Sequence, residues 1–159
     1  MFLFLIIFCF LSTCCDLDRG WVGIKPLKTD KRTVDKLLGA AIIDDVGDYH
    51  YNAQNASIRI RYSGAPCQNL QFGRGMFNVP RDTVLQYTVR FKNRTPISSL
   101  EFDRKKYVRD TGGDVTFVVG YNNPSRGVEV EAEIEQGQEY VHAIHFNRTP
   151  EDAQKFKCS

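Results

Sequence analysis

The chain has 159 residues, with 21 basic and 19 acidic side chains and a formal net charge of +2 at pH 7. This near balance argues against nucleic acid and against an anionic membrane as partners. A chain of this length buries roughly two-thirds of its unfolded surface, which is enough for one hydrophobic core.

The N-terminal residues predict an export signal. Phe2 to Leu11 form an unbroken run of ten apolar residues, about half of the ~20 that a membrane-spanning helix needs. Small residues follow, as at a signal-peptide cleavage site. We therefore expect a signal peptide over 1–14, cut after Cys14, with Cys15 as the alternative position; a bacterial lipoprotein signal ranks lower. The product is expected to be secreted and extracellular, with no membrane attachment after cleavage.

The cysteines predict one disulfide. Cys9 and Cys14 leave with the signal, and Cys15 lies at or beside the cut. Cys67 and Cys158 remain as a pair in an oxidising compartment. The bridge would close a loop of about 90 residues, worth ~4 to 5 kcal/mol in the chain-entropy model. Two unpaired thiols are the alternative, and a retained Cys15 would be left over or compete for a partner.

The chain then divides into an irregular, basic segment over 15–35 and a β domain with a C-terminal tail over 36–159. Residues 36–43 (KLLGAAII) suit either a strand or one helical turn. Alternation of apolar and polar residues predicts strands with one buried face. These strands span 57–62, 83–91, 115–121, 128–134 and 140–146, and turn-forming residues separate them.

The last two strands predict an antiparallel hairpin with a five-residue loop. Pro150 to Lys157 has room for one or two helical turns, with Thr149 as N-cap and Pro150 in the first helical position. The fold class is therefore all-β: a single-domain antiparallel β-sandwich or open barrel with a short C-terminal helix. Phe91 to Pro96 (FKNRTP) and Phe146 to Pro150 (FNRTP) echo each other; chance explains this better than duplication.

Catalytic motifs are missing from the sequence. It contains no HExxH, GxSxG, P-loop or paired CxxC pattern. His142 and His145 lie three apart on a predicted strand, so we expect them on opposite faces and not on one metal. His50 is interpreted as a surface imidazole in a polar turn. We expect no enzyme activity, no metal and no cofactor, although spacing alone does not exclude a carboxylate pair among 19 acidic residues.

Charged rows have two interpretations. One acidic row would bind a Ca²⁺ ion or a basic partner; it consists of Glu129, Glu131, Glu133 and Glu135. More often, such a row is the solvated face of a strand with basic cross-strand partners. We favour the second interpretation. The candidate partners are Arg59 and Arg61 and the basic loop 103–110 (DRKKYVRD). That loop would alternatively meet an anionic surface or a glycosaminoglycan.

Three sequons fit the N-glycan acceptor pattern at Asn55, Asn93 and Asn147. Pro96 and Pro150 directly follow the second and third of them, which lowers their use. Asn55 is the best candidate because it precedes a strand in a polar loop. Unmodified surface turns are the alternative interpretation.

The second half of the chain resembles the multiprotein bridging factor 2 family, small secreted arthropod proteins first described as a transcription co-activator. The similar residues are ISSLEFD over 97–103, Gly112-Gly113, Val128 to Val130, Gly137 and the apolar run 140–146, with KLLG over 36–39 upstream. The resemblance covers about half of the mature chain. It departs from the family's glycine-rich stretch at 117–121. It implies a compact secreted β domain without catalytic residues.

We therefore expect a secreted, monomeric, non-enzymatic binding or effector protein of the saliva, venom, haemolymph or reproductive-fluid type. Its partner is an unknown protein or small ligand. One alternative is a carrier for a small hydrophobic ligand, because aromatic residues form 12% of the chain and would line a barrel as well as fill a core. A second is the co-activator role that the family's name implies. An enzyme with an unfamiliar site is a third.

Overall fold

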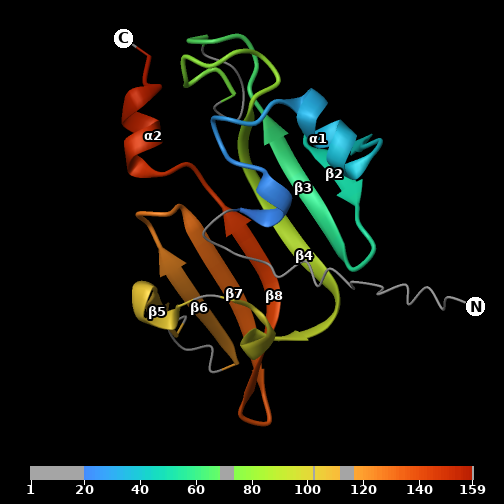
Figure 1. The fold of residues 1–159 in the computed structure, drawn as a ribbon, viewed down its shortest axis with the longest axis vertical. Coiled ribbons are helices and arrows are strands. Elements are labelled where there is room, and N and C mark those ends of the chain that lie inside the picture. Colours follow the sequence, from blue (N-terminus) through green and yellow to red (C-terminus); the bar gives the residue numbers. More distant parts are fainter. Residues whose placement is uncertain (1–19, 69–73, 102, 112–116, 159) are drawn as a thin grey trace, which may run out of the picture.

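A computed structural model of the protein describes residues 20–68, 74–101, 103–111 and 117–158. The predicted signal peptide and Cys15 lie outside these residues, as do Gly112 and Gly113. Within these residues the structure has eight antiparallel strands and two short α-helices, which confirms the all-β prediction (Figure 1). The strands are β1 (Ile42–Ile43), β2 (Tyr49–Asn52), β3 (Ala56–Tyr62), β4 (Val84–Pro96), β5 (Val108–Asp110), β6 (Val118–Asn123), β7 (Val128–Glu135) and β8 (Gln138–Phe146).

The sheet consists of two halves, each built from four consecutive strands. Its order is β1-β2-β3-β4-β8-β7-β6-β5, so β1 and β5 lie at the two edges and β4 pairs with β8 in the middle. The chain passes from β4 to the far edge through residues 97–107, which include the short 3-10 helices η4 (Ile97–Ser99) and η5 (Arg104–Lys106). The two halves are therefore joined by one strand pairing and one crossover.

One row of side chains runs across the inner face of the six central strands. Because alternate residues of a strand share a face, cross-strand neighbours stack into such rows. Every member is 3% exposed or less. In order across the sheet the row is Tyr51, Ile58, Val89, Ile144, Val130 and Tyr121. Both halves thus contribute to a single core.

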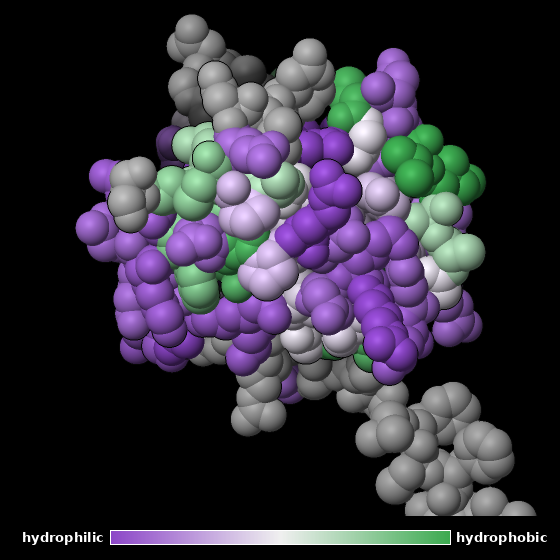
Figure 2. Space-filling model, turned by 90° about the horizontal axis from the view of Figure 1, so that it is seen from above, coloured by the Kyte–Doolittle hydropathy of each residue, from purple (hydrophilic) through white to green (hydrophobic). Residues whose placement is uncertain are grey.

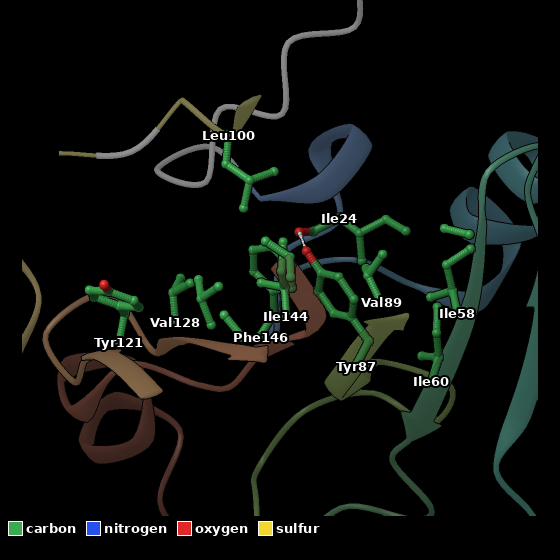
Figure 3. Close-up of a cluster of buried hydrophobic side chains, with 14 of the residues drawn as sticks. Ile24, Ile58, Ile60, Tyr87, Val89, Leu100, Tyr121, Val128, Ile144 and Phe146 are labelled. Carbon is green, nitrogen blue, oxygen red and sulfur yellow. Dashed lines mark hydrogen bonds between the residues drawn. The ribbon is translucent and has the colours of Figure 1, made fainter. Parts of the chain in front are cut away.

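The segment before the sheet covers this inner face, as Figure 3 shows for Ile24. Ile24 and Val34 are fully buried. The hydroxyl of Tyr87 accepts a hydrogen bond from the Trp21 amide (3.0 Å) and donates one to the Ile24 carbonyl (2.9 Å). The helix α1 (Lys31–Leu38) follows, with Asp30 as its N-cap. The segment predicted as irregular therefore contains a helix and shares the core of the β domain.

Strand boundaries differ from the predicted ones where turns are tight. The β7–β8 pairing continues to Glu135 and Gln138, so a two-residue turn replaces the predicted five-residue loop, and that prediction was wrong. Gln136 and Gly137 both have positive φ (51° and 77°), as in a type I′ hairpin turn. The short strands β2 and β5 were not predicted, since three or four residues give too little alternation to recognise.

The C-terminal helix α2 (Pro150–Lys155) begins as predicted, because the Thr149 hydroxyl accepts from the Asp152 amide (3.1 Å). The Cys67–Cys158 disulfide, with its Cα atoms 5.5 Å apart, joins the end of the chain to the segment after β3. A second apolar cluster lies here, formed by Leu27, Phe77, Val79 and Leu85 with Ala153 and Phe156 packed against it. Neither described helix has the length and apolar character to cross a membrane.

We expect the double variant Cys67→Ser/Cys158→Ser to lose stability. The bridge closes a loop of 91 residues in sequence separation, so its loss should lower the free energy of unfolding by ~4 kcal/mol. Urea denaturation of both proteins measures the difference. Reductant should destabilise the wild-type protein and leave the variant unchanged. A difference below ~1 kcal/mol would contradict the stabilising role.

Candidate functional site

The outer face of the first half of the sheet carries charged residues. Tyr51, Ile58 and Ile60 point into the core, so the alternate residues His50, Arg59 and Arg61 of β2 and β3 point outward. The turn between β1 and β2 adds two aspartates, Asp44 and Asp48, to this face. Residues separated by up to 28 positions in the sequence form hydrogen bonds there.

Asp48 is the centre of this network, and its side chain is only 3% exposed. Arg61 binds it with two parallel hydrogen bonds, from Nε (2.9 Å) and Nη2 (2.8 Å). Nη2 of Arg59 lies 3.1 Å from the same carboxylate, and Nη2 of Arg74 lies 3.3 Å from it. Paired arginine hydrogen bonds of this kind compensate a carboxylate for its lost water. The network thus fixes the orientation of three guanidinium groups.

The turn that presents Asp48 depends on a glycine. Gly47 has a φ of +76°, and a Cβ at this position would lie 2.8 Å from Nη1 of Arg74. Only glycine satisfies both the backbone conformation and the close approach of the guanidinium. Arg74 also donates to the Val46 carbonyl (2.7 Å). The side chain of Arg74 thus ties two loops together.

Asp44 completes the network on its outer side. Its carboxylate accepts from the Asp48 amide (2.8 Å) and lies 2.8 Å from Nε2 of His50. The hydrogen bond to His50 is the main reason that the pKa of Asp44 is lowered, with the Asp48 amide and Arg59 adding smaller effects against the opposing effect of burial. Asp44 therefore stays ionised and holds the imidazole in place.

Arg59 and His50 occupy the solvent-facing side of this network. The side chains of Arg59 and His50 are 46% and 43% exposed, whereas those of Asp44 and Asp48 are 23% and 3% exposed. An approaching molecule therefore meets the guanidinium of Arg59 and the imidazole of His50, and the carboxylates that bind them are less exposed. Such an arrangement suits a carboxylate or another hydrogen-bond acceptor on a partner.

An exposed apolar edge adjoins Arg59 and His50. Ile42 and Ile43 of the edge strand β1 are 70% and 56% exposed, and Leu37 at the end of α1 is 51% exposed. Ile42 is the cross-strand neighbour of His50, which is in turn the neighbour of Arg59. Figure 2 shows hydrophobic surface at its right-hand edge, on the side where α1 and β2 lie in Figure 1. We call Leu37, Ile42, Ile43, His50 and Arg59 together the β1 corner.

The histidines of β8 are placed differently from the prediction. Glu131 pairs with Ala143 but Ala132 pairs with Val141, so His142 is an extra residue in a β-bulge. His145 Nε2 lies 3.2 Å from Glu131, and His142 Nδ1 lies 3.7 Å from Glu133. The two histidines therefore share the outer face, and the prediction of opposite faces was wrong because the bulge shifts the alternation by one residue.

The acidic row on β7 has other partners than those predicted. Glu131 and Glu133 face the two histidines, and Glu135 pairs with Arg94. Arg59 and Arg61 bind Asp48 instead, so their assignment to the acidic row was wrong.

The predicted basic loop is also directed elsewhere, toward Glu139. Arg104 and Arg109 lie 3.3 and 3.4 Å from its carboxylate. The Tyr121 hydroxyl donates to the same carboxylate (2.8 Å), and burial, followed by this hydrogen bond, raises the pKa of Tyr121.

The three sequons differ in their exposure. Asn55 and Asn93 are exposed, and they lie near each other because the Lys92 amide donates to the Asn55 carbonyl (2.9 Å). Asn147 is partly buried, and the hydroxyl of its sequon threonine, Thr149, caps α2. The folded chain thus presents two of the three acceptor asparagines at the surface.

The described residues give no indication of a metal centre. Within 20–68, 74–101, 103–111 and 117–158, no three His, Cys, Asp or Glu side chains are grouped so that they would hold a metal ion. The β1 corner and its supporting network were not recognised in the sequence. Arg59 and Arg61 stood out by alternation, but their link to Asp48 and Arg74 needs the folded loops.

We expect Asp48→Asn to destabilise the protein strongly. The variant would leave three guanidinium groups around a neutral amide, and breaking a buried ion pair on one side costs about 3 kcal/mol or more. Urea denaturation measures the loss. Arg59→Gln is the matched control, since its half-exposed side chain should contribute less than ~1 kcal/mol. Equal effects of the two substitutions would contradict a central role for Asp48.

We expect acid to weaken the turn through Asp44. Because its folded pKa lies below the ordinary 3.8, its contribution to stability is complete above the unfolded pKa and is lost as pH falls through the folded value. The free energy of unfolding should therefore fall between about pH 5 and about pH 2 more steeply in wild type than in Asp44→Asn. Exposed Asp45→Asn should keep the wild-type slope. Parallel slopes for wild type and Asp44→Asn would refute this.

Comparison of the chain with protein-family models, curated proteins and solved structures gave no match in any of the three. The functional interpretation therefore rests on the geometry of the β1 corner and on the sequence.

Proposed function

We propose that this chain is a secreted, non-enzymatic binding protein and that it contacts a protein partner through the β1 corner. The observation that carries the proposal is that exposed Ile42 lies beside His50 and Arg59, whose side chains are held by Asp44 and Asp48, while Ile43 and Leu37 are exposed as well. Protein-binding patches commonly combine an apolar centre with arginine and a polar surround.

The apolar part of the corner would supply most of the binding energy. Covering a large aliphatic side chain contributes about 1.5 to 3 kcal/mol when its burial is complete. Leu37, Ile42 and Ile43 are each more than half exposed, so much of that contribution is still available to a partner. Large exposed apolar groups that lie together are typical of interaction sites.

The charged part would supply specificity at low entropic cost. Arg59 lies within ion-pair distance of both Asp48 (3.1 Å) and Asp44 (3.5 Å), and Asp44 also holds His50. Side chains that are already ordered lose less conformational freedom on binding. The partner that fits this corner presents an apolar surface bordered by a carboxylate. Because β1 is an edge strand, the partner also has backbone groups to pair with.

Export and glycosylation fit this proposal. The Cys67–Cys158 disulfide is compatible with an oxidising compartment. Asn55 and Asn93 are exposed as glycan acceptors must be. The predicted signal peptide, the monomeric state and membership of the multiprotein bridging factor 2 family stay predictions, as do the co-activator and enzyme alternatives.

The packing of the interior favours surface binding over the carrier alternative. The inner face of the sheet is occupied by fully buried side chains, of which Tyr51 and Tyr87 are the largest. Figure 3 shows Ile24 and Leu100 lying over the sheet residues Tyr87, Ile144 and Phe146. The aromatic residues that would line a ligand cavity in a barrel are part of this core instead.

We expect Ile42→Ser/Ile43→Ser to weaken partner capture. Immobilised mature protein would be exposed to extracellular fluid of the source, and retained proteins would be quantified by mass spectrometry. The double variant should retain a specific partner at least about tenfold less, since it removes two contacts worth ~1 kcal/mol each or more. Its urea denaturation midpoint should stay unchanged, because both side chains are exposed.

Val108→Ser is the matched control for this experiment. Val108 is an equally exposed aliphatic residue, 68% accessible, on the opposite edge strand β5. It should retain the partner as wild type does. Equal retention by wild type and the Ile42/Ile43 variant would exclude the β1 corner as the contact surface, and loss with Val108→Ser alone would place it at β5.

A further inference from the structure

The crossover between the two halves of the sheet carries three consecutive basic residues at the surface. Arg104, Lys105 and Lys106 form the 3-10 helix η5, and all three are exposed. The Asp103 carboxylate accepts from the Lys105 amide (3.1 Å) and caps this single turn. The triplet thus lies at the surface, between exposed Asp103 and Tyr107, which is buried in the core.

A cut in this turn would leave every strand of the sheet intact. The strands β1 to β4 precede it and the strands β5 to β8 follow it, and each group forms one continuous half of the sheet. After a cut the halves would still be joined by the β4–β8 pairing, which includes Tyr87 with Phe146 and Val89 with Ile144. The Cys67–Cys158 disulfide joins the same two halves covalently.

The strand that follows the triplet, β5, is one of the two short edge strands of the sheet. The strand β5 has three residues, all exposed, and it lies at an edge where it pairs with β6. Segments with few buried contacts open most readily, and a protease requires such local opening to seat a substrate in its cleft. The ion pair of Arg104 with Glu139 lies partly in solvent and opposes this opening only weakly.

We propose that Arg104 to Lys106 is a processing site for an endoprotease that cleaves after basic residues, and that processing yields a two-chain protein held by the Cys67–Cys158 disulfide. A basic side chain would fill the acidic specificity pocket of such an enzyme. The reaction is hydrolysis: water adds across one peptide C–N bond, its hydroxyl going to the carbonyl carbon and its hydrogen to the nitrogen. No oxidant or other reactant is needed.

This inference does not depend on the proposed protein partner. The β1 corner lies entirely in the first half, and its cluster of Asp44, Asp48 and the three arginines is completed by residues before the crossover. Processing would therefore preserve the proposed binding surface.

The test is limited digestion of the mature, disulfide-bonded protein with trypsin at a low enzyme ratio. We expect the first cut within Arg104 to Tyr107, read by N-terminal sequencing as a new terminus at Lys105, Lys106 or Tyr107. The product should run as one species without reductant and as two fragments with it. Size-exclusion chromatography and circular dichroism of the unreduced product should match those of the uncut protein.

Variants separate this site from general protease sensitivity. Arg104→Gln/Lys105→Gln/Lys106→Gln should slow the first cut at least about tenfold. Lys92→Gln/Arg94→Gln, which removes exposed basic residues within β4, should leave its rate unchanged. A first cut of the wild-type chain elsewhere would overturn the proposal. Loss of the folded structure in the unreduced product would overturn it as well.

Discussion

The stacking of Tyr87 on Phe146 is the interaction on which the rest of the structure depends. Their rings lie 4.5 Å apart and nearly parallel, at 9°, across the pairing of β4 with β8. The two halves of the sheet meet at this pairing. The hydroxyl of the same tyrosine fixes the N-terminal segment over the core through the amide of Trp21 and the carbonyl of Ile24. One side chain thus connects both halves and the segment that covers them.

The two faces of the sheet are stabilised by different forces. The inner face is held by burial of aliphatic and aromatic side chains, which is non-directional and tolerates similar shapes. The outer face around Asp48 is held by directional hydrogen bonds between a buried carboxylate and guanidinium groups. Such a network loses much of its value when one member is removed. It keeps Arg59 and His50 in place beside Ile42. The polar and apolar side chains of the β1 corner therefore have fixed relative positions.

The sequence predicted elements whose signals are local. The alternation of Val128, Val130 and Ala132 identified β7, and Thr149 with Pro150 identified α2. The bulge at His142 was not predictable, because an extra residue shows only when the partner strand is known. The Asp48 network was missed for a related reason: Asp48, Arg61 and Arg74 are brought together by two loops. A buried aspartate in a polar turn looks the same in a sequence as an exposed one.

The strand order reads identically from both edges when each strand is exchanged with the one four positions later. The pairing of residues across the strands has the same symmetry. Val89 and Ile144 form its central pair, and Tyr51 and Tyr121 lie at equivalent positions, each two strands away from that pair. Phe91 and Phe146 each lie two residues beyond that pair, so the repeated FKNRTP and FNRTP segments occupy symmetry-equivalent positions. The two four-stranded halves, paired through their last strands, therefore form a sheet whose strand order has a pseudo-two-fold symmetry.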